Sequence, residues 1–486
     1  MADNAHALSN VLYGIQFPES RVTIASVGQC DMTHITQVTI DSRLVASGAL
    51  YVALVGMTVD GHAYVAAAAA AGAVAALVAE AKADAIANEQ GWSVVHLGQQ
   101  PPASWQGILL IAVPDPLAAL HRWATWHRSR YAPQYVVGIT GSVGKTSTKE
   151  IVGAILDDAM PTLKTPRSYN SESTLPLVTL GLTEAHRAAV FEMGMYYAGD
   201  IQTLCAIAQP NIAVITAVGP SHLERMGSIE AIADAKAELV ESIPAAGVVI
   251  LNADDSIVAG FAKRTPARII TYGTSERADV RAVDIITHGL GGTEVRIVAP
   301  GIDDRIHISA PGMHQVRNAL AAISVGIVAH VPWASMRDTL LNRFKSLRFV
   351  IYDGLEQSQI IDDTYNAAPT SVRAALELLA TVDRRRVAVL GDMRELGHIE
   401  AQAHRDVGIQ AAQTADVLLA VGTRGKWIAE GARSAGMSAV YEVPTTEAAI
   451  PVLIHILAPS DCILVKGSRA MAMEAIVAAL RVDVAK

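Results

Sequence analysis

The chain has 486 residues, of which 51% are hydrophobic and 17% are charged. This balance excludes an intrinsically disordered protein, and the length allows about two to four domains, each with its own core. The net charge of −9 argues against nucleic acid as the main partner.

The cysteines and the first residues indicate the cellular compartment in which the chain folds. Cys30, Cys205 and Cys462 are far apart and lack metal-ligand spacing, so we expect buried thiols in a reducing cytoplasm. The chain does not start with basic residues followed by an apolar run, so no signal peptide is predicted. The uncharged segment 63–79 is mostly alanine and is followed at once by Glu80. We therefore predict an alanine-rich helix packed on a sheet, in a soluble protein without membrane insertion.

Strands and helices alternate along most of the chain, which predicts parallel sheets covered by helices. In the first part we expect strands at 49–55 and 108–113, the start of a second unit at 75–78, and a helix over 116–130. In the middle part, strands are expected at 136–140, 188–192, 212–216 and 247–251, antiparallel strands within 271–309 and a helix over 314–330. Strands and helices alternate again in the last part, with strands expected at 359–362, 386–390, 417–421 and 462–465.

We predict three α/β domains. They are a smaller N-terminal domain over 1–112, a central P-loop domain with a parallel sheet over 113–331, and a Rossmann-like C-terminal domain over 332–486.

Residues 136–150, VVGITGSVGKTSTKE, predict a phosphate-binding turn between a buried strand and a helix. Gly141 and Gly144 let the backbone approach an anion, although Ile139 stands where a standard P-loop has its first glycine. Lys145 can neutralise phosphate charge, and a hydroxyl of the next two residues can bind Mg²⁺. We expect nucleoside triphosphate contacts from Thr140, Gly141, Ser142, Val143, Gly144, Lys145, Thr146 and Ser147.

Polar residues also follow other predicted strands, where open α/β sheets form their sites. Glu192 suits Mg²⁺ coordination, whereas His222 can equally be a ligand or a packing residue. By position alone, Lys236 is predicted to be a solvated lysine on a helix surface. The side-chain amides of Asn252 and Asn318 can form hydrogen bonds with the edge of an adenine base, or with the backbone of a turn or a helix cap. In the last domain, the segments after Asp362, Gly391 and Lys466 predict a polar ligand site.

With these residues in view, the chain resembles the Mur ligase family, ATP-dependent amide-forming enzymes of peptidoglycan precursor synthesis. The resemblance covers nearly the whole chain and rests on motifs in one order. They are Asp41-Ser42-Arg43, Asp60-Gly61-His62, the P-loop in its T-G-S-V-G-K-T form, Glu192-Met193-Gly194, His222-Leu223-Glu224, Lys236, Asn318 to Ala322, Asp363 to Pro369, Leu390 to Gly397 and Lys466 to Arg469.

The resemblance implies roles for individual residues. Ser42 and Arg43 would contact a UDP-sugar, and Asn252, Asn318 and Arg348 would contact the nucleotide. Lys145, Glu192, His222 and Lys236 would form the catalytic centre, with metal held by Thr146, Glu192, His222 and a carbamylated Lys236. The substrate would contact Asn170, and the incoming amine would lie near Asp363, Tyr365 and Asn366.

Within the family, the chain is most similar to the ligase that joins D-Ala-D-Ala to UDP-N-acetylmuramoyl-tripeptide through an acyl phosphate. The resemblance implies ATP and Mg²⁺ as cofactors, a cytoplasmic location and a monomer. The chain departs from the family in the SYNSEST segment at 168–174, at Ala368 and at Ala217. A ligase that adds the third amino acid and an ATP-binding regulator without catalysis remain the alternatives.

Overall fold

The computed structural model describes residues 6–16, 29–56, 58–343 and 350–482. The chain groups into two compact units. The first unit comprises Met1–Val136, Pro161–Met193 and Gln202–Pro210, and the second comprises Val137–Met160, Gly194–Ile201 and Asn211–Lys486.

The N-terminal sheet of the first unit has five parallel strands in the order β3-β4-β5-β7-β6. Its strands are β3 (Gln37–Thr39), β4 (Ala49–Val52), β5 (Ala75–Ala79), β6 (Ser93–His96) and β7 (Leu109–Val113), and its helices are α3 (Val65–Ala70) and α4 (Glu80–Gln90). The strands β4 and β7 are buried along their whole length, which is what their continuous apolar sequence predicts.

The predicted alanine helix is wrong for the second half of its segment. Helix α3 ends at Ala70, and Gly72 then adopts a φ of +108° that a helix does not contain. Ala75–Ala79 forms the central strand β5, at the place where a second unit is predicted to begin. Small side chains suit a strand that is covered on both faces.

The first unit contains further strands and helices besides this sheet domain. They are β1 (His6–Ala7), β2 (His34–Ile35), α1 (Leu8–Gly14), α2 (Gln29–Met32), α5 (Pro116–Arg130), α7 (Leu175–Thr179), β9 (Thr162–Lys164) and β10 (Ala188–Glu192), with α8 (Asp200–Ala208) beginning in the second unit. Helix α5 occupies the predicted residues because Asp115 accepts from the amides of Leu117 and Ala118, and Pro116 stands at the first position. It packs against α1 and α7, and β9 pairs in parallel with β10.

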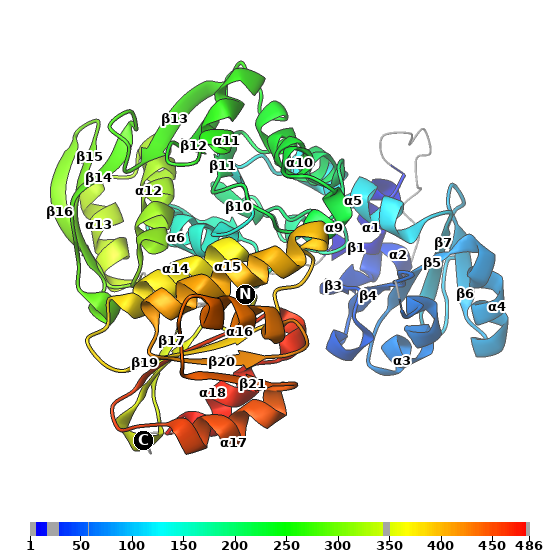
Figure 1. Cartoon of the computed structure of the whole chain (residues 1–486). Helices are drawn as coiled ribbons and strands as arrows, with labels where there is room; N and C mark the ends of the chain where they lie inside the picture. The colour runs from blue at the N-terminus through cyan, green and yellow to red at the C-terminus, as the bar shows by residue number, and fades with distance from the viewer. Residues whose placement is uncertain (1–5, 17–28, 57, 344–349, 483–486) are drawn as a thin grey trace. The chain divides into compact units, whose positions relative to one another are not determined.

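The nucleotide-binding part of the second unit is built on seven strands in the order β16-β15-β14-β13-β12-β11-β8. They are β8 (Tyr135–Thr140), β11 (Ile212–Ile215), β12 (Val248–Asn252), β13 (Arg268–Gly273), β14 (Val280–Thr287), β15 (Thr293–Ala299) and β16 (Ile302–Ile308). As predicted, β14, β15 and β16 are antiparallel and lie at the edge of the sheet (Figure 1).

Six helices accompany these strands among the described residues. They are α6 (Lys145–Asp157), α9 (Leu223–Met226), α10 (Ile229–Glu241), α11 (Ser256–Gly260), α12 (Met313–Val328) and α13 (Trp333–Asn342). Helix α12 packs on α6 and on β12, β13 and β14, while α13 contacts α6 and β16.

The C-terminal sheet has six strands in the order β17-β18-β22-β19-β20-β21. They are β17 (Val350–Asp353), β18 (Gln359–Asp362), β19 (Arg386–Gly391), β20 (Val417–Val421), β21 (Val440–Val443) and β22 (Cys462–Lys466). Helices α14 (Pro369–Ala380), α15 (Glu400–Thr414) and α16 (Gly425–Ser434) cover one face, and α17 (Thr446–Ile456) and α18 (Glu474–Leu480) cover the other (Figure 1). Because β18, β22 and β19 are parallel neighbours, the three polar segments that follow them lie at one edge.

All three cysteines are buried, as predicted, and burial raises the pKa of the Cys462 thiol to about 12. Each helix within the described ranges is too short or too polar to cross a lipid bilayer.

Candidate active site

The phosphate-binding turn joins β8 to α6. Gly141 and Gly144 have φ angles of +149° and +86°, which glycine adopts without a steric cost. A Cβ at Gly141 would lie 2.0 Å from Thr216 Oγ1, so a close approach of two loops also requires glycine there. Helix α6 starts at Lys145, and its N-terminal amides therefore point toward the turn.

Thr216, at the end of β11, holds this turn in shape. Its hydroxyl donates to Val143 O at 2.6 Å, and the Ser142 amide donates to Ala217 O at 2.7 Å. Lys145 Nζ donates to Gly141 O at 2.6 Å, which folds the lysine over the turn. The turn is therefore preformed around the space in which phosphates would sit.

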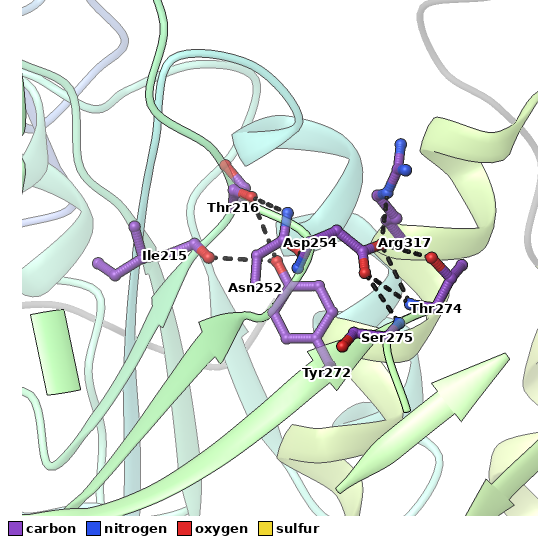
Figure 2. Close-up of polar contacts among 8 residues, drawn as sticks. All are labelled: Ile215, Thr216, Asn252, Asp254, Tyr272, Thr274, Ser275 and Arg317. Carbon is purple, nitrogen blue, oxygen red and sulfur yellow. Dashed lines mark hydrogen bonds and ion pairs between the residues drawn. The ribbon is translucent and has the colours of Figure 1, made fainter. Parts of the chain in front are cut away.

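Asn252 belongs to a buried polar network that includes Thr216 (Figure 2). Its Nδ2 donates to Thr216 O at 2.8 Å, and the Tyr272 hydroxyl donates to Ile215 O at 3.1 Å. Asn252 Oδ1 accepts from the Asp254 amide, so both ends of its side-chain amide are engaged within the protein. These contacts match the turn-forming alternative, and a base contact by Asn252 stays a prediction.

Asp254 extends the network to α12 and to the turn after β13. It accepts from the amides of Thr274 and Ser275 and from Arg317 Nε at 3.0 Å (Figure 2). Burial would raise the pKa of Asp254, but these hydrogen bonds outweigh burial and lower the pKa.

Helix α12 carries two further polar side chains, of which Asn318 reaches the phosphate-binding turn. Asn318 Oδ1 accepts from Thr148 Oγ1 at 3.2 Å and lies 2.8 Å from where a Cβ of Gly144 would be. Burial lowers the pKa of His314 to about 4, with the charges of Lys466 and Arg317 acting in the same direction. Arg348 lies outside the described residues.

Lys236 is fully enclosed in α10 and not on its solvated face, with 2% of its surface exposed. Burial, and secondarily the charge of Lys145, lowers its pKa well below the usual range of a lysine. The interpretation of Lys236 as a solvated helix lysine is therefore wrong.

In the first unit, Glu192 ends β10 with 1% of its surface exposed. Its Oε1 accepts from Asn170 Nδ2 at 2.8 Å, so two predicted site residues are in direct contact. Glu192 is therefore not a surface residue, and as a buried carboxylate it needs polar or cationic partners.

His222 precedes α9 with a φ of +62°. Its Nδ1 lies 2.5 Å from Glu395 Oε2, and its ring meets Tyr196 edge to face with the centroids 5.2 Å apart. The hydrogen bond to His222 lowers the pKa of Glu395, which keeps that group a carboxylate.

The residues predicted near the incoming amine follow β18. Lys466, at the end of β22, donates to Asp363 Oδ2 at 2.6 Å and to Asn366 O at 2.9 Å. Asn366 and Tyr365 are exposed, whereas Lys466 is buried. Three polar segments thus meet as predicted, although Asp392 caps α16 through the amides of Arg424 and Gly425 instead of facing solvent.

In the N-terminal sheet domain, Ser42 and Arg43 lie in a short 3-10 turn after β3. Arg43 makes two parallel hydrogen bonds to Asp41, and 86% of its side chain is exposed. Nearby, Asp60 accepts from His62 Nδ1 at 2.6 Å, while the Ala79 amide donates to His62 Nε2. The Asp60-Gly61-His62 motif therefore connects β5 to the loop before α3 through hydrogen bonds.

In the part of the chain that the structure describes, no three His, Cys, Asp or Glu side chains are grouped to hold a metal. The predicted set differs from such a group because it contains a threonine and a lysine. By residue type, the buried carboxylate of Glu192 and the buried hydroxyl of Thr146 are oxygen ligands that a divalent cation prefers, and the lowered pKa of the enclosed Lys236 amine suits carbamylation. Thr146, His222 and Lys236 belong to the second unit and Glu192 to the first.

Three family models match successive segments of the chain. They are the Mur ligase family catalytic domain at residues 34–121, the Mur ligase middle domain at 139–326 and the Mur ligase glutamate ligase domain at 347–469. A UDP-N-acetylmuramoyl-tripeptide–D-alanyl-D-alanine ligase from Mycobacterium tuberculosis is 33% identical over 95% of both chains. The chain belongs to the Mur ligase family.

Solved structures of Mur ligases have the same fold. MurF from Acinetobacter baumannii superposes with a TM-score of 0.82 at 28% identity, over 98% of both chains. MurF from Thermotoga maritima, solved in complex with ADP, superposes with a TM-score of 0.75 at 26% identity, over 91% of this chain and 96% of that one. The predicted three-domain α/β fold and the ATP-dependent peptide ligase activity of peptidoglycan synthesis are confirmed for this Mur ligase.

Sequence reasoning missed three residues that shape the site of this Mur ligase. Thr216 was passed over because a threonine ending a buried strand carries no distinctive pattern. Lys466 and Glu395 lie within motifs named above but were assigned no individual role, and the signal that could have selected them was their position at the ends of neighbouring strands of one sheet.

Proposed function

We propose that this Mur ligase joins D-Ala-D-Ala to UDP-N-acetylmuramoyl-tripeptide and converts ATP to ADP and phosphate. The observation that carries this proposal is the end-to-end similarity to a ligase of that name. The match includes the N-terminal and C-terminal domains, in which we expect the UDP-sugar and the amine to bind.

The reaction proceeds in two steps. The terminal carboxylate oxygen of the tripeptide attacks the γ-phosphorus of ATP, so a carbon–oxygen–phosphorus link forms and the bond to ADP breaks. The free amine of D-Ala-D-Ala then attacks the acyl carbon, the amine loses its proton, and phosphate leaves from the tetrahedral intermediate. Activation is needed because a carboxylate is a poor electrophile.

The phosphate-binding turn and Lys145 would stabilise the negative charge that develops during phosphoryl transfer. Thr146, Glu192, His222 and a carbamylated Lys236 would hold Mg²⁺, which supplies charge neutralisation at the phosphoryl oxygens when bound. Carbamylation joins the neutral amine nitrogen of Lys236 to CO₂ and releases a proton. The lowered pKa of Lys236 supports this proposal because only the neutral amine can react.

The substrates would bind on the other two domains. Arg43, with most of its guanidinium in solvent, and Ser42 are proposed for the UDP-sugar. Asn170, beside Glu192, is proposed for the peptide, and Asp363, Tyr365 and Asn366 for the amine. The domain boundaries at 112 and 331 and the monomeric state also stay proposals, to be checked by limited proteolysis and analytical ultracentrifugation.

The decisive experiment measures phosphate release from ATP with UDP-N-acetylmuramoyl-tripeptide, with and without D-Ala-D-Ala. Release that requires both substrates, with a pentapeptide product of the correct mass, would support the proposal. Release with a single amino acid in place of the dipeptide would assign the chain to a sister activity. ATP binding without release under either condition would indicate the non-catalytic regulator.

A further inference from the structure

The loop after β19 reaches the segment that carries His222 through three contacts. Glu395 Oε2 lies 2.5 Å from His222 Nδ1, and the Glu224 amide donates to Glu395 O at 3.1 Å. Arg225 lies 4.0 Å from the other carboxylate oxygen. One residue of the C-terminal sheet domain therefore contacts both the backbone and the side chains at the start of α9.

The backbone at this contact is unusual on both sides. His222 and Glu395 have φ angles of +62° and +64°, and neither is glycine. A left-handed conformation costs a non-glycine residue about 1 to 2 kcal/mol, so it persists only where surrounding contacts hold it. Gly397, with a φ of +55°, allows the approach, since a Cβ there would lie 3.1 Å from the Glu224 Cα.

The His222 ring is held in orientation as well as in place. Tyr196 meets the ring edge to face at an interplanar angle of 76°, and the Arg225 guanidinium stacks 4.6 Å above the Tyr196 ring. Because a carboxylate accepts hydrogen bonds, its contact with Nδ1 places the ring proton on that nitrogen. Nε2 is then the nitrogen with a lone pair.

We propose that Glu395 is a positioning residue that fixes the tautomer and orientation of the His222 imidazole. Its carboxylate holds the Nδ1–H, and this leaves the lone pair on Nε2, which is then the nitrogen that can bind a metal. Such carboxylate–histidine pairs orient ligand imidazoles and raise their basicity. Because Glu395 follows β19, the arrangement of His222 depends on the docking of the C-terminal sheet domain.

This inference rests on the proposed role of His222, but its first test needs no catalysis. Long-range ¹H–¹⁵N spectra of protein labelled at histidine nitrogen report the tautomer of each ring, and His222→Gln identifies the relevant signals. We expect the Nδ1–H tautomer at His222 in the unmodified chain. In Glu395→Ala we expect averaged nitrogen shifts, whereas Glu395→Gln, which retains an acceptor oxygen, should keep most of the Nδ1–H signal.

A double-mutant cycle supplies the second readout. Glu395→Ala should lower kcat by about 10- to 100-fold and change the KM for ATP little. In a His222→Ala background it should cause almost no further loss. Glu377→Ala, an exposed glutamate of α14, is the matched control and should leave kcat unchanged.

An unchanged tautomer in Glu395→Ala, or equal losses in both backgrounds, would overturn the positioning role. A ligase assay that fails for the unmodified chain would instead overturn the proposed function, and it would leave the spectra of His222 unaffected.

Discussion

Lys236 is the residue whose environment departs furthest from ordinary expectation. A lysine that is almost fully buried beside Lys145 is costly as an ammonium ion, so burial favours an uncharged or modified side chain. We predict that Lys236→Ala lowers kcat by about 100-fold or more. Formate or acetate should partly restore activity by supplying a carboxylate. Steady-state phosphate release with increasing carboxylate measures this rescue.

The control for this experiment is Lys263→Ala, which removes an exposed lysine of the same unit. It should keep full activity and should not respond to carboxylate. Full activity of unrescued Lys236→Ala would contradict the carbamate assignment.

Gly141 offers a test of the preformed phosphate-binding turn. An alanine Cβ would meet Thr216 Oγ1 at 2.0 Å, and φ is +149°, so Gly141→Ala must displace the turn. We expect the Kd for ATP to rise at least about tenfold, as measured by titration calorimetry, because the phosphate-binding amides move. Gly91→Ala has a positive φ but open space around its Cβ, and it should bind ATP normally. Equal affinities of the two variants would refute this explanation.

At the residue scale, motif residues were predictable where chemistry needs a particular backbone, as at Gly141 and Gly144. Burial was not predictable for Lys236, since a lysine in an alanine-rich helix has the composition of a solvated face. The hydrogen-bond partners of Asn252 and Asn318 were not predictable either, because an amide side chain can form hydrogen bonds with the backbone of a turn as well as with a nucleotide base.

The elements of the C-terminal sheet are joined by one buried carboxylate. Asp392 follows β19 and accepts from the amides of Arg424 and Gly425 at the start of α16, while its carbonyl accepts from the Ser468 amide after β22. We predict that Asp392→Ala lowers the free energy of unfolding by about 2 kcal/mol, because one buried and one partly buried amide lose their acceptor. Urea unfolding of the whole chain measures this change.

Asp392→Asn retains one acceptor oxygen and should lose less stability. Asp406→Ala on the exposed side of α15 should change it by less than about 0.5 kcal/mol. A loss in Asp406→Ala that equals the loss in Asp392→Ala would rule out the capping account.

At the element scale, the buried parallel strands were predictable from continuous apolar runs, with bounds that shift by a few residues. The alanine-rich segment was harder because alanine suits a helix and a doubly covered strand alike. Gly72 is the local signal that separates α3 from β5, and its meaning depends on sheet pairing that the sequence does not display.

The whole molecule should lose stability in mild acid because of His127 in the first unit. Burial, and secondarily His6, lowers the pKa of His127 to about 4, and its Nε2 donates to Leu182 O at 2.9 Å. The pKa of a histidine in the unfolded chain is about 6.5. Below that pH the unfolded chain binds a proton at His127 that the folded chain does not bind, so the free energy of unfolding falls as the pH falls toward 4. This contribution is about 2 kcal/mol between pH 7 and pH 5.

His127→Gln can still donate to Leu182 but cannot titrate. The advantage of the unmodified chain over this variant should therefore shrink by about 2 kcal/mol from pH 7 to pH 5, as measured by urea unfolding at both values. Parallel stabilities at the two values would show that His127 does not cause the acid sensitivity.

At the scale of the whole molecule, the three-domain α/β fold was predictable because ordered motifs span nearly the whole chain. Contacts between segments that are far apart in sequence were not predictable, and His222 with Glu395 is the clearest case. Neither residue type demands the other, and only the folded loops bring them together.

Because the cysteines are buried, we expect the native chain to react very slowly with thiol reagents. Fluorescent dyes could therefore be placed on cysteines introduced at the surface without first removing the natural ones. One dye near the phosphate-binding turn and another beyond α14 would convert any movement of the C-terminal sheet during turnover into an optical signal. The rate at which the natural thiols become labelled would then measure how often the hydrophobic cores open spontaneously.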